Sequence, residues 1–168
     1  MFNFKEDIIA VLKEVDSVLQ MRNEQLTVCI VGYSAIVMAN LNNRGSNDID
    51  VMYNRFSTVL RQRGLEVFDE SYFHFHPTYQ TRLHPIEAGF SNLLASYADP
   101  HDIFLLKLNA FREKDKSDLL YLVQQQLVDV KLLDLLFKEW NIHWFDNNQE
   151  IANNYASVRG SYGSNKEI

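Results

Sequence analysis

The amino-acid sequence predicts a mixed α+β fold, in which a small mixed β-sheet is flanked by helices. Two short runs, TVCIVG at 27–32 and DIDVMY at 48–53, are typical of buried strands, and helical patterns surround them. From about residue 99 onward every pattern is helical. The chain has 168 residues, 46% of them hydrophobic, which is enough for one globular domain with a buried core.

The predicted sheet begins after an N-terminal helix. That helix is indicated by apolar residues at helical spacing with charged residues between them, namely Ile8, Ile9, Leu12, Val15, Val18 and Leu19. TVCIVG then forms a strand that ends in glycine, and YSAIVMANL at 33–41 suits a helix that leaves this glycine. DIDVMY is the second strand. A charged helical stretch follows it through Arg63 and stops at Gly64.

Short strands and then helices are expected in the rest of the chain. Aromatic and polar residues alternate over several short segments between Leu65 and Phe90, which predicts antiparallel strands. The run DPHD at 99–102 combines proline with acidic neighbours, as the starts of helices do. Further helices are expected at residues 117–127, 130–140 and about 144–158. We therefore expect a single domain over residues 1–158, helical from about residue 99, and a mobile tail at 159–168.

Charge and cysteine content narrow the class of protein. The 22 acidic residues outnumber the 16 basic ones, which argues against a general nucleic-acid binder but leaves a local basic patch open. The single cysteine, Cys29, lies in an apolar run, so we expect a packed thiol in a reducing compartment. No apolar run approaches the roughly 20 residues that span a bilayer, and Lys5, Glu6 and Asp7 stand where a signal peptide would be apolar. We expect a cytoplasmic protein with no membrane partner.

The stretch RGSNDIDV, at 44–51, carries two aspartates as the chain enters a strand. One interpretation is a polar turn in which Asp50 caps a helix. The other is that strand alternation directs Asp48 and Asp50 to the same side, where two carboxylates repel unless a cation lies between them. Their oxygens suit Mg²⁺. Gly32 opens a helix whose amides attract phosphate, so the two features together predict a site for a nucleoside triphosphate.

Two segments resemble a known family. VGYSAIVMANLNNRGSNDIDV resembles the glycine-then-DxD signature of the nucleotidyltransferase fold, the DNA polymerase beta-like superfamily, in its bacterial R-x-[ST]-x-D-x-D form. YADPHDIFLLKLNAFREKDKSDLLYLV is similar to a helical segment of uncharacterised bacterial nucleotidyltransferase-like proteins, related to abortive-infection and toxin–antitoxin nucleotidyltransferases. The resemblance covers roughly residues 27 to 123. The second segment matches the family at Lys107, Arg112, Lys114, Asp115 and Asp118.

The resemblance implies an enzyme that uses Mg²⁺ to transfer a nucleoside monophosphate from an NTP to a hydroxyl, mostly by positioning and charge neutralisation. Asp48 and Asp50 are the expected metal ligands, and Glu87 is the expected third catalytic carboxylate. The hydroxyl would belong to tRNA, another RNA or a protein, in a toxin–antitoxin or phage-defence setting with a partner toxin or antitoxin. The residues expected to bind the nucleotide are Gly32, Ser34, Arg44, Ser46 and Lys107.

Two departures from the family pattern favour a second interpretation. The family usually has Gly or Ser directly after the first glycine, where this chain has Tyr33, and His84 stands where a third aspartate is expected. A chain with these departures would be a catalytically inactive binding module that serves as an antitoxin or nucleotide sensor.

The charged residues of the second segment also have a structural interpretation. Lys107 and Arg112 would then lie on an exposed helix face with intrahelical ion pairs, for example between Arg112 and Asp115. Asp115 and Asp118 are interpreted as salt-bridge or capping partners.

Overall fold

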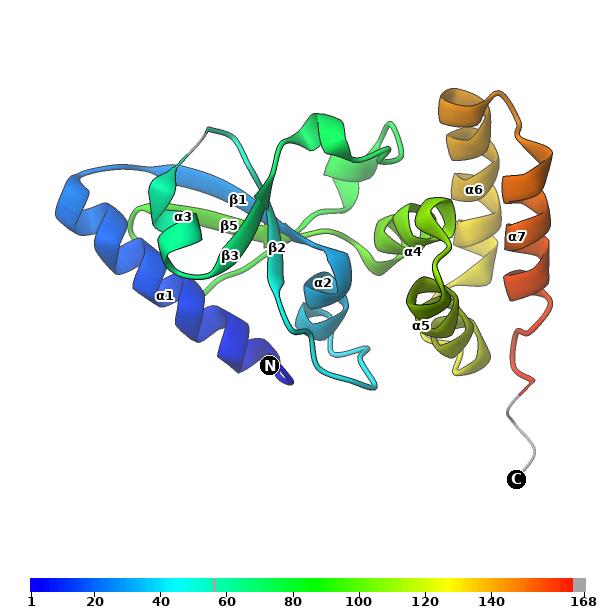
Figure 1. The fold of residues 1–168 in the computed structure, drawn as a ribbon, viewed down its shortest axis with the longest axis horizontal. Helices are drawn as coiled ribbons and strands as arrows, with labels where there is room; N and C mark the ends of the chain where they lie inside the picture. The colour runs from blue at the N-terminus through cyan, green and yellow to red at the C-terminus, as the bar shows by residue number, and fades with distance from the viewer. Residues whose placement is uncertain (56, 165–168) are drawn as a thin grey trace. The chain divides into compact units, whose positions relative to one another are not determined.

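The computed structural model describes residues 1–55 and 57–164, which form two compact units. The first unit comprises Met1–Phe73 and Gln80–Asp99, and it holds every strand of the described chain. The second comprises His74–Tyr79 and the chain from Pro100 onward. The predicted mixed α+β class is confirmed, since a five-stranded mixed sheet occurs together with seven α-helices in the described residues (Figure 1).

The sheet of the first unit has the strand order β3-β2-β1-β5-β4. Its strands are β1 (Leu26–Val31), β2 (Ile49–Tyr53), β3 (Leu65–Phe68), β4 (His84–Pro85) and β5 (Leu93–Tyr97). β1 pairs with β2 antiparallel and with β5 parallel, β2 pairs with β3 parallel, and β4 pairs with β5 antiparallel. The two predicted strands, TVCIVG and DIDVMY, are thus neighbours in the middle of the sheet.

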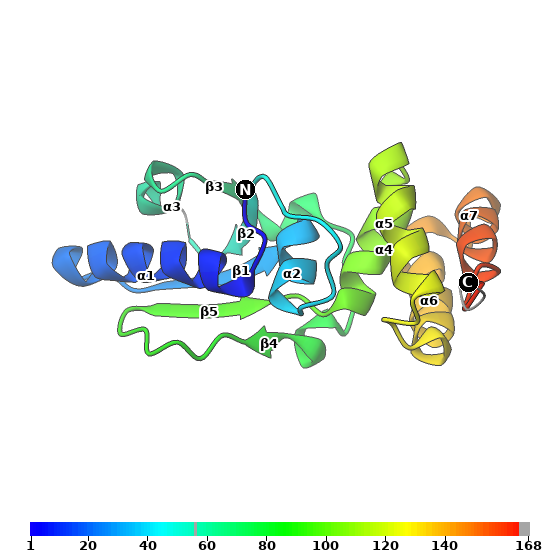
Figure 2. The same cartoon turned by 90° about the horizontal axis from the view of Figure 1, so that it is seen from below.

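Three α-helices cover one face of this sheet: α1 (Lys5–Arg22), α2 (Gly32–Met38) and α3 (Thr58–Gln62). α1 contacts α2, α3 and β5, and Figure 2 shows it lying alongside β1 and β5. The predicted apolar stripe of α1 is confirmed for the buried residues Ile8, Leu12, Val15, Val18 and Leu19.

Alternation along the strands separates the sheet residues into two faces. Beneath the helices lie buried apolar residues at paired positions, namely Leu26, Val28, Ile30, Ile49, Val51, Leu65, Leu93 and Ala95. The residues between them, among them Cys29, Asp50 and Glu66, point to the opposite face. Cys29 is buried and forms no disulfide, as predicted. The acidic residues of β2 and β3 therefore share the face opposite to α1, α2 and α3.

Asp16 connects α1 to the start of β5. Its carboxylate accepts hydrogen bonds from the backbone N–H groups of Ser91, Asn92 and Leu93 at 3.0, 2.7 and 2.8 Å. Gln20 Nε2 donates a further hydrogen bond at 2.8 Å. Burial alone would raise the pKa of Asp16, but these hydrogen bonds outweigh it, so the pKa lies below its ordinary value.

The prediction of antiparallel strands between Leu65 and Phe90 was wrong for most of that stretch. Only β3 and the two-residue β4 form there, and 3-10 helices occupy Glu70–Tyr72 and Tyr79–Arg82. β3 runs parallel to β2 because α3 carries the chain back to the start of the sheet between them. β5, which pairs with the central strand β1, was not predicted from the sequence.

The second unit contains α4 (Pro100–Ala110), α5 (Glu113–Gln124), α6 (Val130–Phe145) and α7 (Gln149–Arg159), as the helical patterns predict. α6 is longer than expected and includes Trp144, because left-handed residues at Asp146 and Asn147 end it later. Trp140 and Trp144 donate hydrogen bonds of 2.6 Å to the carbonyl oxygens of His74 and Phe75, which joins the segment 74–79 to α6.

No helix in the described part of the chain is long and apolar enough to cross a membrane. The last four residues of the expected tail, 165–168, lie outside the described residues, and residues 160–164 form turns.

Candidate functional site

The turn between β1 and α2 holds Gly32 against Asp50. Gly32 has φ of +62°, in the left-handed region that glycine adopts at little cost. A Cβ built on Gly32 would lie 3.2 Å from Asp50 Cγ and would overlap the carboxylate oxygen Oδ2. Val31 and Asp50 are paired across β1 and β2, which explains this closeness. Two residues from separate elements therefore lie in contact, and a side chain at position 32 would displace the Asp50 carboxylate.

Ser34 supports the turn from its buried side. Its side chain is fully buried, and Oγ donates a hydrogen bond of 2.8 Å to the carbonyl oxygen of Val31. The backbone N–H of Asp50 donates to the same Oγ at 3.4 Å. The Ser34 hydroxyl thus ties the Gly32 turn to β2 from the buried side.

Arg44, Ser46 and Asp48 lie in the loop that leads into β2. Asp48 is exposed and precedes the first residue of β2, so it belongs to the loop and not to the strand as predicted. Ser46 is buried, and its Oγ donates a hydrogen bond of 2.8 Å to the carbonyl oxygen of Asp48. The guanidinium carbon of Arg44 lies 3.5 Å from the ring centroid of Tyr33. Arg44, Ser46 and Asp48 thus lie on the loop that leads directly into the strand of Asp50.

Glu87 does not join this group. It follows β4, and both β5 and β1 separate β4 from β2. Neighbouring strands lie about 4.8 Å apart, so three spacings place β4 roughly 14 Å from β2. The expectation that Glu87 shares the sheet face with Asp50 within reach of one ion is therefore not met.

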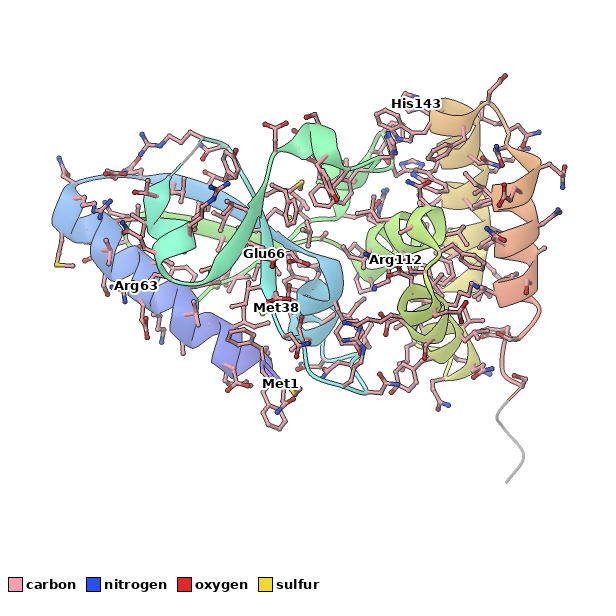
Figure 3. All side chains as sticks on the ribbon, in the orientation of Figure 1. Met1, Met38, Arg63, Glu66, Arg112 and His143 are labelled. Carbon is pink, nitrogen blue, oxygen red and sulfur yellow. The ribbon has the colours of Figure 1, made fainter. Side chains whose placement is uncertain are left out.

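A different glutamate stands beside Asp50. Glu66 on β3 is the direct neighbour of Asp50 in the parallel register, and paired residues of adjacent strands point to the same face. Glu66 is exposed, and Figure 3 labels it where β3 runs beside β2. The signal in the sequence was an acid between two apolar residues, Leu65 and Val67, after the helix that follows the second strand. The antiparallel interpretation of this stretch does not pair Glu66 with Asp50, whereas the parallel register does.

Lys107 belongs to the second unit, where it neutralises two buried aspartates. Its Nζ lies 3.1 Å from Asp115 Oδ1 and 2.8 Å from Asp118 Oδ2. Its side chain is only 11% exposed, so Lys107 does not lie on an exposed helix face. The interpretation of Asp115 and Asp118 as salt-bridge partners is confirmed. Asp115 also accepts from Arg112 Nε at 2.7 Å and from the Arg112 backbone N–H, which caps α5.

The charges around Asp115 fix its ionisation. Burial by itself would raise the pKa of this carboxyl, but the hydrogen bond from Arg112 and the charge of Lys107 outweigh it and lower the pKa. Asp115 is therefore a charged member of a buried ion-pair group.

The comparison with protein families decides the assignment. A family model described as "Nucleotidyltransferase of unknown function (DUF6036)" matches residues 6–162. The chain belongs to this family. The predicted resemblance to nucleotidyltransferases is thereby confirmed. The search of curated proteins and the search of solved structures found no match.

In this DUF6036 protein the first unit offers a donor set for a hard cation. No group of three His, Cys, Asp or Glu residues in the described chain is close enough to hold a metal ion by itself. Mg²⁺ usually binds one or two carboxylates and takes its other ligands from water and substrate phosphates. Asp50, fitted against the bare Cα of Gly32, and the exposed Asp48 meet that requirement. The residues therefore fit Mg²⁺ held together with a triphosphate.

Proposed function

We propose that this chain is a Mg²⁺-dependent nucleotidyltransferase that moves a nucleoside monophosphate from an NTP to a hydroxyl of an RNA or a protein. The observation that carries the proposal is the contact of the Asp50 carboxylate with Gly32. It joins a backbone without a side chain, which lets a phosphate approach, to a carboxylate that suits Mg²⁺. The family assignment over residues 6–162 supports the same reaction class.

In the proposed reaction, the oxygen of the acceptor hydroxyl forms a bond to the α-phosphorus, the bond from that phosphorus to the bridging oxygen breaks, and pyrophosphate leaves. Bound Mg²⁺ would supply charge neutralisation at the phosphates. Asp48 and Asp50 would hold the ion. Glu66, beside Asp50 on the same sheet face, would orient the acceptor hydroxyl and accept its proton. Glu66 thus replaces Glu87 as our third carboxylate.

Other residues of the first unit would shape the nucleotide site. Arg44 carries a positive charge in the loop that bears Asp48 and would offset phosphate charge. Gly32 would let the backbone approach a phosphate, while Ser34 and Ser46 hold the turn and the loop. For Lys107 we assign the neutralisation of its two aspartate partners in the second unit. The family resemblance supports three further parts of the proposal: an RNA acceptor such as tRNA, a partner toxin or antitoxin, and a role in phage defence.

One observation favours a second function. Because no three acidic, histidine or cysteine side chains of the described residues converge on one point, the site lacks a preformed cluster for two metal ions. A nucleotide sensor or antitoxin that binds an NTP without transferring it needs no such cluster. We keep this catalytically inactive binding module as the alternative.

Calorimetry followed by a release assay separates the two functions. Mg-ATP, Mg-GTP, Mg-CTP and Mg-UTP are titrated into the protein, and pyrophosphate release is then measured with cell extract as the source of acceptor. Binding with release supports the transferase, and binding without release supports the sensor. If no triphosphate binds, both proposals fail. Glu66→Gln gives a sharper test, because the transferase predicts that this variant still binds the NTP but releases little pyrophosphate.

A further inference from the structure

Tyr33 stands directly after Gly32 and reaches into the loop that carries Asp48. Its hydroxyl donates a hydrogen bond of 3.0 Å to Asn43 Oδ1 and accepts one of 3.2 Å from the Asn43 backbone N–H. Its ring faces the guanidinium of Arg44, whose carbon is 3.5 Å from the ring centroid, close enough for a cation–π interaction. The side chain is only 7% exposed. Tyr33 thus binds two successive loop residues, one by its hydroxyl and one by its ring.

The same loop is held at a second point nearer to Asp48. Ser46 forms two backbone hydrogen bonds with Phe2, of 2.8 and 2.9 Å. Its hydroxyl donates to the carbonyl oxygen of Asp48 at 2.8 Å. Asp48 itself is exposed and lies outside β2, so its place relative to Asp50 depends on the conformation of the loop. The contacts of Tyr33 and of Phe2 together define that conformation.

We propose that Tyr33 is a positioning residue for the metal-binding Asp48: it fixes the loop from Asn43 to Asp48 on the helix that Gly32 opens. This inference rests on the proposed function. A carboxylate on a loose loop must be ordered when the ion binds, which weakens binding, whereas a loop that is already held loses less entropy. Tyr33 also keeps Arg44 beside the turn, so one side chain places a carboxylate and a cation.

Two variants separate the contribution of the Tyr33 hydroxyl from that of its ring. Tyr33→Phe keeps the ring below Arg44 and removes both hydrogen bonds of the hydroxyl, while Tyr33→Leu removes the ring as well. Tyr72→Phe is the matched control, because Tyr72 is 70% exposed and lies in the same unit outside this loop. Hydrogen exchange of the amides at 43–50 reports loop order, and calorimetry with Mg-ATP, and with ATP in EDTA, reports binding.

We expect Tyr33→Phe to speed exchange of the loop amides and to weaken Mg-ATP binding, each by about five- to thirtyfold, which corresponds to the loss of one to two ordinary hydrogen bonds. Tyr33→Leu should weaken it further. For Tyr33→Phe, affinity for ATP in EDTA should change little, because the proposed role acts through the ion, whereas a general loss of structure would weaken the binding of ATP with and without Mg²⁺. If Tyr33→Phe behaves as Tyr72→Phe while the unaltered protein binds Mg-ATP, the role of Tyr33 is refuted and the proposed function stands. If the unaltered protein binds no Mg-ATP, the proposed function fails and this role of Tyr33 fails with it.

Discussion

Replacing Gly32 by alanine tests the contact on which the proposed site depends. A non-glycine residue in the left-handed conformation costs about 1 kcal/mol. The new Cβ would also overlap Oδ2 of Asp50, a half-buried side chain that must rotate away, and an off-rotamer side chain costs about a further 0.5–1.5 kcal/mol. We therefore expect Gly32→Ala to lower the free energy of unfolding of the first unit by about 1.5–2.5 kcal/mol.

Gly64→Ala is the matched control for the cost of placing a non-glycine residue in the left-handed conformation. Gly64 belongs to the same unit and has φ of +78°, but a Cβ there meets no atom within 4 Å in the described part of the chain. This variant should therefore lose only about 1 kcal/mol. The difference between the two alanine variants measures the overlap with Asp50.

A double-mutant cycle tests whether the additional cost of Gly32→Ala arises from Asp50. In an Asp50→Ala background, Gly32→Ala should cost about 1 kcal/mol, so the coupling between the two sites should be about 0.5–1.5 kcal/mol. Urea unfolding followed by far-UV circular dichroism is the assay, because both tryptophans, Trp140 and Trp144, lie in the second unit. Equal losses for Gly32→Ala and Gly64→Ala, with no coupling to Asp50, would refute the reasoning.

Three further predictions concern the charged groups. Asp48→Asn with Asp50→Asn should abolish Mg²⁺-dependent NTP binding in calorimetry while the protein stays folded, because Asp48 is exposed and Asp50 only half-buried; unchanged NTP affinity would mean that these acids do not bind the ion. Asp16→Asn should cost about 1–3 kcal/mol at pH 7. Although burial opposes it, hydrogen bonding lowers the pKa of Asp16, so its stabilisation is present above the unfolded pKa and is lost as pH falls through the folded one; the urea midpoints of variant and wild type should converge in acid, and a constant gap would contradict this. Lys107→Ala leaves its two aspartate partners buried without their shared cation, so it should lower the free energy of unfolding by about 3–5 kcal/mol, measured by tryptophan fluorescence in urea. A loss in ATP affinity with unchanged stability would instead indicate that Lys107 binds the phosphates.

The helices and the first two strands were predictable because their signals are local. Apolar spacing alone located α1 and its buried face, and the proline at 100 marked the start of α4. The β-branched run before Gly32 likewise located β1, since a buried strand needs apolar side chains on both faces. The sequence also singled out Gly32 and Asp50, although it offered the cation site and the polar turn as alternatives.

Strand order and register were beyond the sequence because they depend on pairing between distant segments. The residues of a strand do not specify which strand will pair with it. The local sequence therefore did not predict that β5 would pair with β1 or that β4 would lie at the edge of the sheet. That order excludes Glu87 from the site and places Glu66 beside Asp50. The contact of Gly32 with Asp50 and the hydrogen bond of Tyr33 to Asn43 likewise join residues from different segments. The sequence by itself determined which residue types are available for a phosphate and a cation; the tertiary structure decided which of them meet, because only the packed sheet fixes the distances between their side chains.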